Sequence, residues 1–262
     1  MPVVSVYTTF DGVALRDGVD ITPEGVVEKL RAGQMPTLSQ PSPGDFYQVY
    51  RGIAERAPGG KAPPIVSIHV TAKLSGTQNS AALARRMCPD LDITIVDSGT
   101  GSMGAGFMVL KAARAAQAGM DRDQVVAIAR RAAAQACFYL LVPDLAFIHH
   151  AGRLGKAAVW LGQSLSLAPV LSVSDGVVVP YRLSRSKDRA LHALATAAAR
   201  RYRRDQPMWA AAVHVDAEND ARLVLDEVAG LFQLEEKHLR HAGAAVSAVL
   251  GPGTVGLCML PA

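Results

Sequence analysis

Ser67-Ile-His-Val-Thr-Ala-Lys-Leu-Ser-Gly-Thr-Gln-Asn-Ser80 is the stretch that decides the fold of this chain. It predicts a short buried strand from Ile65 to Val70, a loop of small polar residues, and an alanine-rich helix that begins near Gln78. Such a loop brings hydroxyls and free backbone N–H groups to the positive end of a helix dipole, where anions bind. The sequence therefore predicts an anion site in this loop.

Two further loops have the same character, namely Ser39-Gln-Pro-Ser42 and Asp97-Ser-Gly-Thr-Gly-Ser102. Strand, Gly/Ser loop and helix recur along the first half of the chain, and the strands are apolar on both faces. This pattern predicts an α/β fold with a mostly parallel sheet and helices on both of its faces. Because ligands of such sheets bind at the carboxyl ends of the strands, we expect the three loops to line one pocket.

The recurring pattern of strand, Gly/Ser loop and helix stops near residue 150. We therefore expect an α/β domain over residues 1–150 and a second α/β domain over residues 151–262. In the second domain Asp175-Gly176 predicts a hairpin, as Asp11-Gly12 does in the first. Three prolines predict a loop without a ladder over residues 35–45. A helix is expected over residues 157–167, and two final strands are expected over residues 243–250 and 255–260.

The composition of the 262 residues limits the function. Half of them are hydrophobic and only 5% are aromatic, and the net charge is +4. No run of Lys and Arg with interleaved aromatic residues is present, which argues against a nucleic-acid partner. The densest basic segment, residues 200–204, ends a predicted helix and is interpreted as a solvated helix terminus. The alternative is a docking surface, nucleic acid included.

The cysteines, the histidines and the apolar segments of the sequence bear on the cellular compartment and on metal binding. The three cysteines have no metal or redox spacing, which is typical of a reduced, cytoplasmic protein. No apolar run approaches the roughly 18 residues of a membrane span. His149 and His150 are adjacent and make a poor metal pair, and His69 is interpreted as a core or loop-facing histidine rather than a ligand. We therefore predict no metal, no cofactor and no membrane span.

Three groups of residues are candidates for chemistry. Ser75-Gly76-Thr77 is interpreted as a carboxylate or phosphate cradle, and ordinary helix capping is its alternative. Asp97 and Ser98 could act as base and nucleophile, although an Asp in this position more often binds loop backbone. Arg153, between two glycines, suits bidentate binding of phosphate or carboxylate, and it could equally tie two domains together.

Several segments together resemble the DegV family of bacterial lipid-binding proteins, and they occur in the family's order across nearly the whole chain. The segments are Arg16 to Ile21, Ser39 to Phe46, Ser67 to Thr77, Val96 to Gly104, Gly152 to Gly155, Pro169 to Gly176, and Gly251 to Gly256. Each motif is weak by itself, and the ordered set is specific.

The resemblance implies a two-domain protein that binds a long-chain fatty acid in a buried tunnel between the domains. Ser75 is then the main head-group residue, with Ser39, Thr37, Gly76 and Thr77 nearby and Arg153 as a phosphate-facing cation. Relatives of this kind carry the fatty acid for a separate, ATP-using fatty acid kinase. The resemblance therefore implies a non-enzymatic lipid carrier in lipid transport or fatty acid metabolism.

This sequence departs from the family pattern in three places. Leu38 stands directly before Ser-Gln-Pro-Ser, where the family has Thr, and Thr37 lies one position earlier. Val249 stands where kinase-associated members have His. The family's first strand, which ends in Asp-Ser, is expected to be missing ahead of Pro2. These departures put phosphoryl transfer in doubt, and the rival hypothesis is a small-molecule kinase or hydrolase that uses Asp97, Ser98 and Arg153.

Overall fold

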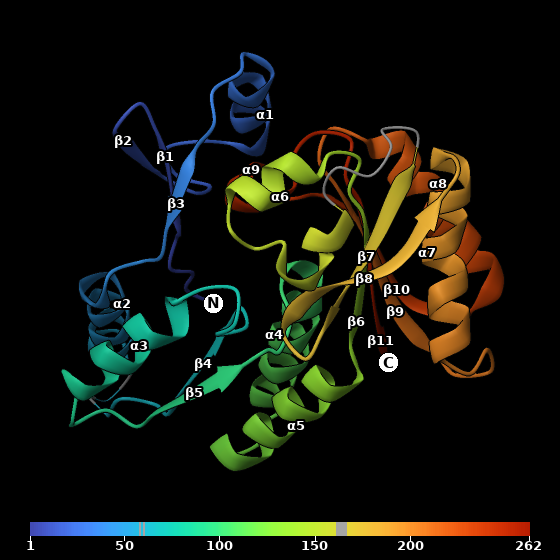
Figure 1. Ribbon diagram of the computed structural model, residues 1–262. Coiled ribbons are helices and arrows are strands. Elements are labelled where there is room, and N and C mark those ends of the chain that lie inside the picture. The colour runs from blue at the N-terminus through green and yellow to red at the C-terminus, as the bar shows by residue number, and fades with distance from the viewer. Residues whose placement is uncertain (58, 60, 161–166) are drawn as a thin grey trace.

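The computed structural model describes residues 1–57, 59, 61–160 and 167–262, and it has the predicted α/β architecture. Figure 1 shows a smaller lobe that carries β1 to β5 and α1 to α3, and a larger lobe built on a six-stranded sheet. The helices α4 (Ser102–Gln117) and α5 (Arg122–Gln135) stand between the β4–β5 pair and the six-stranded sheet, and both helices contact strands of each.

The smaller lobe begins with the predicted hairpin of β1 (Tyr7–Phe10) and β2 (Val13–Arg16). Asp11 and Gly12 both have positive φ, as this tight turn requires. Helix α1 (Pro23–Arg31) follows. The loop expected over residues 35–45 is wrong in part, because β3 (Thr37–Ser39) pairs with β1. The prolines lie outside this three-residue strand, so they do not interrupt its ladder.

The strand–loop–helix unit around Ser75 forms as predicted. Helix α2 (Pro43–Glu55) begins at Ser42, whose side chain forms a capping box with Asp45. Strand β4 (Ile65–His69) is parallel to β5 (Ile93–Asp97), and α3 (Thr77–Arg86) joins them. Buried side chains of α2, α3, β4 and β5 form one hydrophobic cluster, which fixes this unit.

The six-stranded sheet has the order β10-β9-β11-β6-β7-β8. The strands are β6 (Cys137–Leu141), β7 (Ala168–Ser174), β8 (Val177–Ser184), β9 (Met208–His214), β10 (Leu234–His241) and β11 (Val255–Pro261). The expectation of mostly parallel pairing is wrong here, because only β9 and β10 are parallel in this sheet. The cause is local, since β7 and β8 form the predicted Asp175-Gly176 hairpin and β11 enters between β9 and β6 in the opposite direction.

Helices cover both faces of this sheet, as predicted. On β6, Phe138 and Leu140 pack in the cluster that includes α4 and α5, whereas Tyr139 and Leu141 pack in the cluster with α7 (Lys187–Arg201) and α8 (Glu218–Leu231). This alternation is the period of two that a strand imposes. A sheet with apolar side chains on both faces must be buried on both sides.

The last part of the chain corrects the sequence prediction. Residues 244–250 form helix α9 (Ala244–Leu250) rather than a strand, and α9 packs against α1 and α6 (Leu145–His150). The edge strand β10 was not predicted from the sequence, because the charged residues of this strand obscure the alternation of apolar and polar side chains. Gly155–Trp160 is a 3-10 helix, and the rest of the helix expected over residues 157–167 lies outside the described residues.

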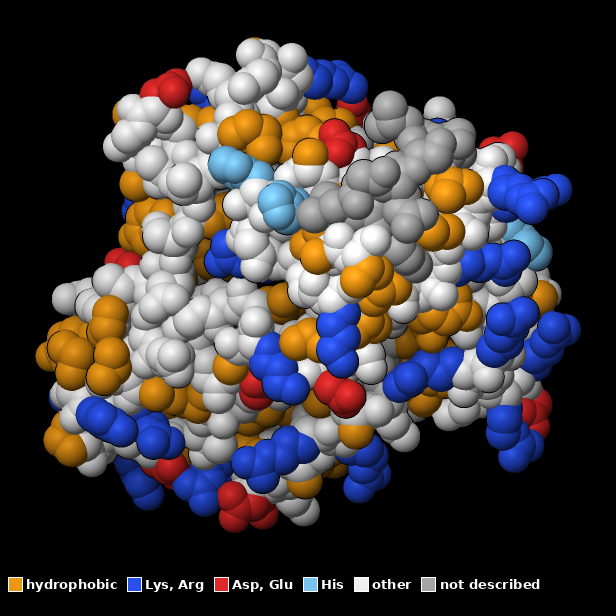
Figure 2. All heavy atoms as spheres, viewed as in Figure 1, with side chains coloured by type: hydrophobic (Ala, Val, Ile, Leu, Met, Phe, Trp, Pro, Cys, Tyr) orange, Lys and Arg blue, Asp and Glu red, His pale blue; other side chains and the backbone are white. Residues whose placement is uncertain are grey.

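The division into domains at residue 150 stays a prediction. Strand β6, at residues 137–141, belongs to the same sheet as β7 to β11. Cations are spread over the lower part and the right side of the face shown in Figure 2, without a single dense patch. In the basic helix end at residues 200–204, Arg201 donates to the carbonyl of Ala136 and Arg203 pairs with Asp205.

Candidate functional site

A mostly apolar cavity of about 280 Å³ lies where the two lobes meet. It is lined by the end of β3, the loop after β4, the start of α4, strands β6 to β8, and helices α6 and α9. The lining residues are Val6, Asp17, Leu38, Ser39, Gln40, Val70, Leu74, Ser75, Gly101, Ser102, Phe138, Leu140, Ile148, Arg153, Val173, Val178, Ala245, Val246, Val249 and Leu250.

All three predicted loops reach this cavity. Ser39 comes from the first loop, Ser75 from the second, and Gly101 and Ser102 from the third. Three strand ends, those of β3, β4 and β5, direct these loops to one place. The expectation that the loops line a common pocket is therefore confirmed, and the polar end of the cavity is made largely of hydroxyl groups.

Ser75 holds the start of α3 and faces the cavity at the same time. Its Oγ lies 2.7 Å from Thr77 Oγ1 and accepts a hydrogen bond from the Thr77 N–H at 3.3 Å. Gly76, the cap residue of α3, offers no side chain to the helix. The two interpretations of this segment, a helix cap and an anion cradle, are thus compatible. Thr77 is buried, and neither Thr77 nor Gly76 lines the cavity.

Arg153 follows α6 and reaches across to the Ser75 loop. Its Nε donates to the Leu74 carbonyl at 3.2 Å, and Nη1 donates to the Ala151 carbonyl. Among the described residues, no carboxylate lies within ion-pair distance of this guanidinium. Arg153 therefore ties the two lobes together and also lines the cavity with positive charge that a ligand anion can use.

Glycine at position 155 lets the segment that follows Arg153 approach strand β8 closely. Its φ is +57°, and a Cβ there would lie 2.7 Å from the Val178 carbonyl oxygen. A larger residue would push the segment after Arg153 away from β8, a strand that also lines the cavity.

The two departures from the family pattern, Leu38 and Val249, both line the cavity. Thr37, which is exposed, does not line it. Thr37 thus does not substitute for the hydroxyl that the family has at position 38. Leu38 and Val249 are both apolar, and the polar side chains that line the cavity are those of Asp17, Ser39, Gln40, Ser75, Ser102 and Arg153.

Asp97 and Ser98 are occupied by the backbone. The Asp97 carboxylate accepts from the N–H groups of Ala72 and Gly99, at 3.1 and 2.8 Å. Ser98 is fully buried, and its hydroxyl donates to the Thr100 carbonyl at 2.8 Å. Neither residue lines the cavity. This geometry supports the loop-backbone interpretation and argues against Asp97 and Ser98 as base and nucleophile.

His69, at the end of β4, is a buried core histidine, as predicted. Its Nε2 lies 2.9 Å from Ser67 Oγ, which is 2.9 Å from the Tyr50 hydroxyl. Burial lowers the pKa of His69 to about 4, so the imidazole is neutral at neutral pH. The strand that leads to the Ser75 loop therefore carries an uncharged hydrogen-bonded chain rather than a ligand-binding imidazole.

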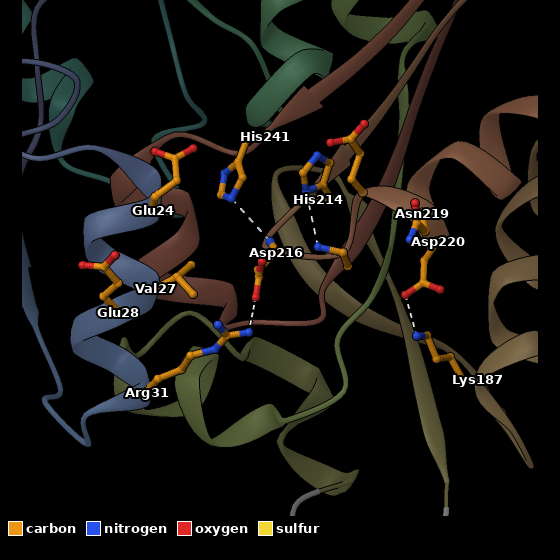
Figure 3. Close-up of a pocket in the computed structure, with 12 residues that line it drawn as sticks. Glu24, Val27, Glu28, Arg31, Lys187, His214, Asp216, Asn219, Asp220 and His241 are labelled. Carbon is orange, nitrogen blue, oxygen red and sulfur yellow. Dashed lines mark hydrogen bonds and ion pairs between the residues drawn. The ribbon is translucent and has the colours of Figure 1, made fainter.

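A second, larger hollow of about 810 Å³ lies between α1, the ends of β9 and β10, and the start of α8 (Figure 3). It is polar, and its arginine and its lysine are each paired with an aspartate of the same hollow: Arg31 with Asp216, and Lys187 with Asp220 at 2.5 Å. The Ala217 N–H donates to His214, which is buried beside His241. None of the predicted site residues lies in this hollow.

Some lining residues of the apolar cavity were missed by the sequence analysis. Asp17 binds the N–H groups of Ala244 and Ala245 at the start of α9, and Ser102 and Val246 line the cavity from two helices. Only Ser102 carried a local signal, since it ends the third polar loop. The described residues contain no metal-binding cluster of His, Cys, Asp or Glu. Across that same part of the chain, no helix is both long and apolar enough to cross a membrane.

The chain is thus of the class of two-lobed α/β proteins with an apolar, partly hydroxyl-lined cavity where the lobes meet. Within this class, the family model described as an uncharacterised protein of the DegV family matches residues 1–262. The chain therefore belongs to the DegV family, as the resemblance of its motifs predicted.

Individual relatives agree with this assignment. A DegV domain-containing protein of Streptomyces coelicolor is 34% identical over 248 residues, which cover 93% of this chain and 85% of that protein. The structure of a DegV family protein from Thermus thermophilus, described for its fatty acid binding, has a TM-score of 0.91 and 32% identity, over 99% of this chain and 91% of that one. The structure of DegV of Bacillus subtilis, described as a fatty acid binding protein, has a TM-score of 0.88 and 25% identity. This match covers 99% of this chain and 91% of that one.

Proposed function

We propose that this protein binds a long-chain fatty acid in the apolar cavity, with the carboxylate at Ser75 and the acyl chain among the side chains of β6 to β8 and α9. The observation that carries the proposal is one cavity whose walls are apolar and whose polar end is lined by Ser39, Ser75 and Arg153. The related proteins described as fatty acid binding support it.

The physical chemistry of the site suits such a ligand. Each methylene that leaves water contributes about 0.8 kcal/mol, so a long acyl chain provides most of the binding free energy. The carboxylate is buried at little cost only if it is hydrogen-bonded, and hydroxyl groups with an unpaired guanidinium satisfy that need. Binding is therefore expected to require both ends of the ligand.

The protein acts as a carrier in lipid transport or fatty acid metabolism, without a catalytic site of its own. Presentation of the carboxylate to a separate fatty acid kinase is the finer part of this proposal, and Arg153 is the cation that would face a phosphate. Leu38 and Val249 make the head-group end less polar than in kinase-associated relatives, so carriage does not depend on phosphoryl transfer.

The test is to identify the ligand that accompanies the purified protein. Native mass spectrometry, followed by lipid extraction, should find a long-chain fatty acid at one molecule per chain. The delipidated protein should then bind palmitate in a titration. A delipidated protein that is folded and does not bind palmitate would overturn the proposal.

A further inference from the structure

The Ser39 loop and the Ser75 loop are far apart in the sequence, and a single side chain joins them. Gln40 follows Ser39 directly and lies against the start of α3. Its Nε2 donates to Ser80 Oγ at 3.1 Å, and Ser80 is buried in the first part of this helix. Gln40 also lines the cavity. The contact thus spans the two segments that supply Ser39 and Ser75.

The amide oxygen of Gln40 occupies the space above Gly76. A Cβ built on Gly76 would lie 1.8 Å from Gln40 Oε1 and 2.7 Å from Cδ. The φ of Gly76 is −75°, a value that any residue adopts. The backbone therefore does not require glycine here, and a Cβ at this position would have to displace the Gln40 side chain.

The electrostatics of this contact are favourable. Helix α3 begins at Thr77 with no side-chain cap on Gly76 and no acidic residue in its first turn. The partial negative charge of an amide oxygen is stabilised beside the positive end of a helix. A neutral amide provides this without a negative charge, which would repel a ligand carboxylate at Ser75.

Gln40 itself is held in place from both sides. Ser39 ends β3, which pairs with β1, and Ser42 is fixed by its capping box at the start of α2. Pro41 lies between these anchors and is buried. The backbone around Gln40 is thus restrained, so its side chain transmits the position of the β3 end to the start of α3.

We propose that Gln40 is the positioning residue of the head-group site: it locks the Ser39 loop onto the start of α3, so that Ser39 and Ser75 face one carboxylate at a fixed spacing. The requirement for glycine at position 76 follows from this lock. The part that concerns the carboxylate rests on the proposed fatty acid binding, and the part that concerns Gly76 does not.

A double-mutant cycle in thermal unfolding tests the lock without any ligand. Gly76→Ala should lower the unfolding midpoint by about 5 °C or more, because Cβ and the Gln40 amide cannot share one space. In a Gln40→Ala background the same substitution should cost less than a third of that shift. If Gly76→Ala alone does not fold, the double variant should restore folding. An equal cost in both backgrounds, or a double variant that also fails to fold, would overturn the lock.

Two ligands with the same chain test the positioning role. Gln40→Ala should weaken palmitate binding about tenfold and leave the binding of hexadecanol, which lacks the carboxylate, within twofold. The exposed Gln48→Ala on α2 is the matched control and should change neither. Equal weakening of both ligands, or of neither, would overturn the positioning role. If the wild-type protein binds no palmitate, the proposed function fails. The unfolding cycle still shows whether Gln40 locks the Ser39 loop onto the start of α3.

Discussion

The two hollows of this molecule differ in their size and in the pairing of their cations. The larger one, near α1 and α8, is about 810 Å³, and its Arg31 and Lys187 are paired with its own aspartates. The smaller one is about 280 Å³, and its Arg153 has no carboxylate partner among the described residues. The cation without a carboxylate partner beside apolar walls, rather than the size of the hollow, is why we propose the smaller hollow as the ligand site.

The largest effect is expected from filling the smaller hollow. Val246→Phe places a ring in the apolar part of the cavity and displaces about three methylenes of the acyl chain. At about 0.8 kcal/mol each, the affinity for palmitate should fall roughly 50-fold in a titration. Asn219→Phe, which places the same ring in the larger hollow, should leave the affinity unchanged. Equal effects of the two variants would contradict the assignment of the ligand to the smaller hollow.

The next effect concerns the core beneath the smaller hollow. The neutral form of His69 is favoured in the folded state, because burial lowers its pKa to about 4 from an ordinary value of 6.5. The unfolded chain therefore binds more protons between these values. The free energy of unfolding should be highest above about pH 6.5 and fall toward pH 4, by on the order of 2 kcal/mol.

Urea unfolding at several pH values measures this fall. His69→Gln keeps a polar side chain beside Ser67 and does not titrate, so its stability should change less over the same range. A variant with the same pH dependence as the wild type would show that other groups are responsible. It would also mean that the neutral hydrogen-bonded chain of His69, Ser67 and Tyr50 does not stabilise the strand that leads to the Ser75 loop.

A smaller effect is expected from one hydroxyl at the head-group end. Ser75→Ala removes a hydrogen bond to the ligand carboxylate and should weaken palmitate binding by about 1–2 kcal/mol in the same titration. The exposed Ser174→Ala at the end of β7 is the matched control, with no expected change. An unchanged affinity for Ser75→Ala would mean that Ser75 serves the start of α3 alone.

The smallest effect belongs to the larger hollow. Arg31→Ala removes the ion pair with Asp216, whose side chains are substantially exposed, so the free energy of unfolding should fall by only about 0.2–1 kcal/mol. Chemical denaturation measures this change. The affinity for palmitate should not change at all. A tenfold loss of affinity would show that the larger hollow belongs to the site.

Local signals predicted much of the fold. Asp11-Gly12 and Asp175-Gly176 formed hairpins, because tight turns need residues that tolerate positive φ. Ser42 and Asp45 formed a capping box. Residues 244–250 and strand β10 were mispredicted because tertiary packing decided them: α9 buries an alanine face against α1, and β10 is an edge strand with charged outer residues.

The site was predictable only in part. Ser39, Ser75 and Arg153 lie in polar or glycine-flanked loops, which a sequence displays, and the structure brings them to one cavity. The steric contact between Gln40 and Gly76 depends on how two distant loops meet, which no local pattern encodes. Thr37 and Thr77 are candidates because they belong to or adjoin the polar motifs, yet neither lines the cavity: Thr77 is buried at the start of α3, and Thr37 is exposed.

A crystal structure of the protein with palmitate is the most direct test of the central claim. We predict that the carboxylate lies within hydrogen-bond distance of Ser75 Oγ and that the acyl chain runs between Leu140 and Val246 in the smaller hollow. Palmitate bound in the larger hollow beside His214, or with its carboxylate away from Ser75, would contradict the account.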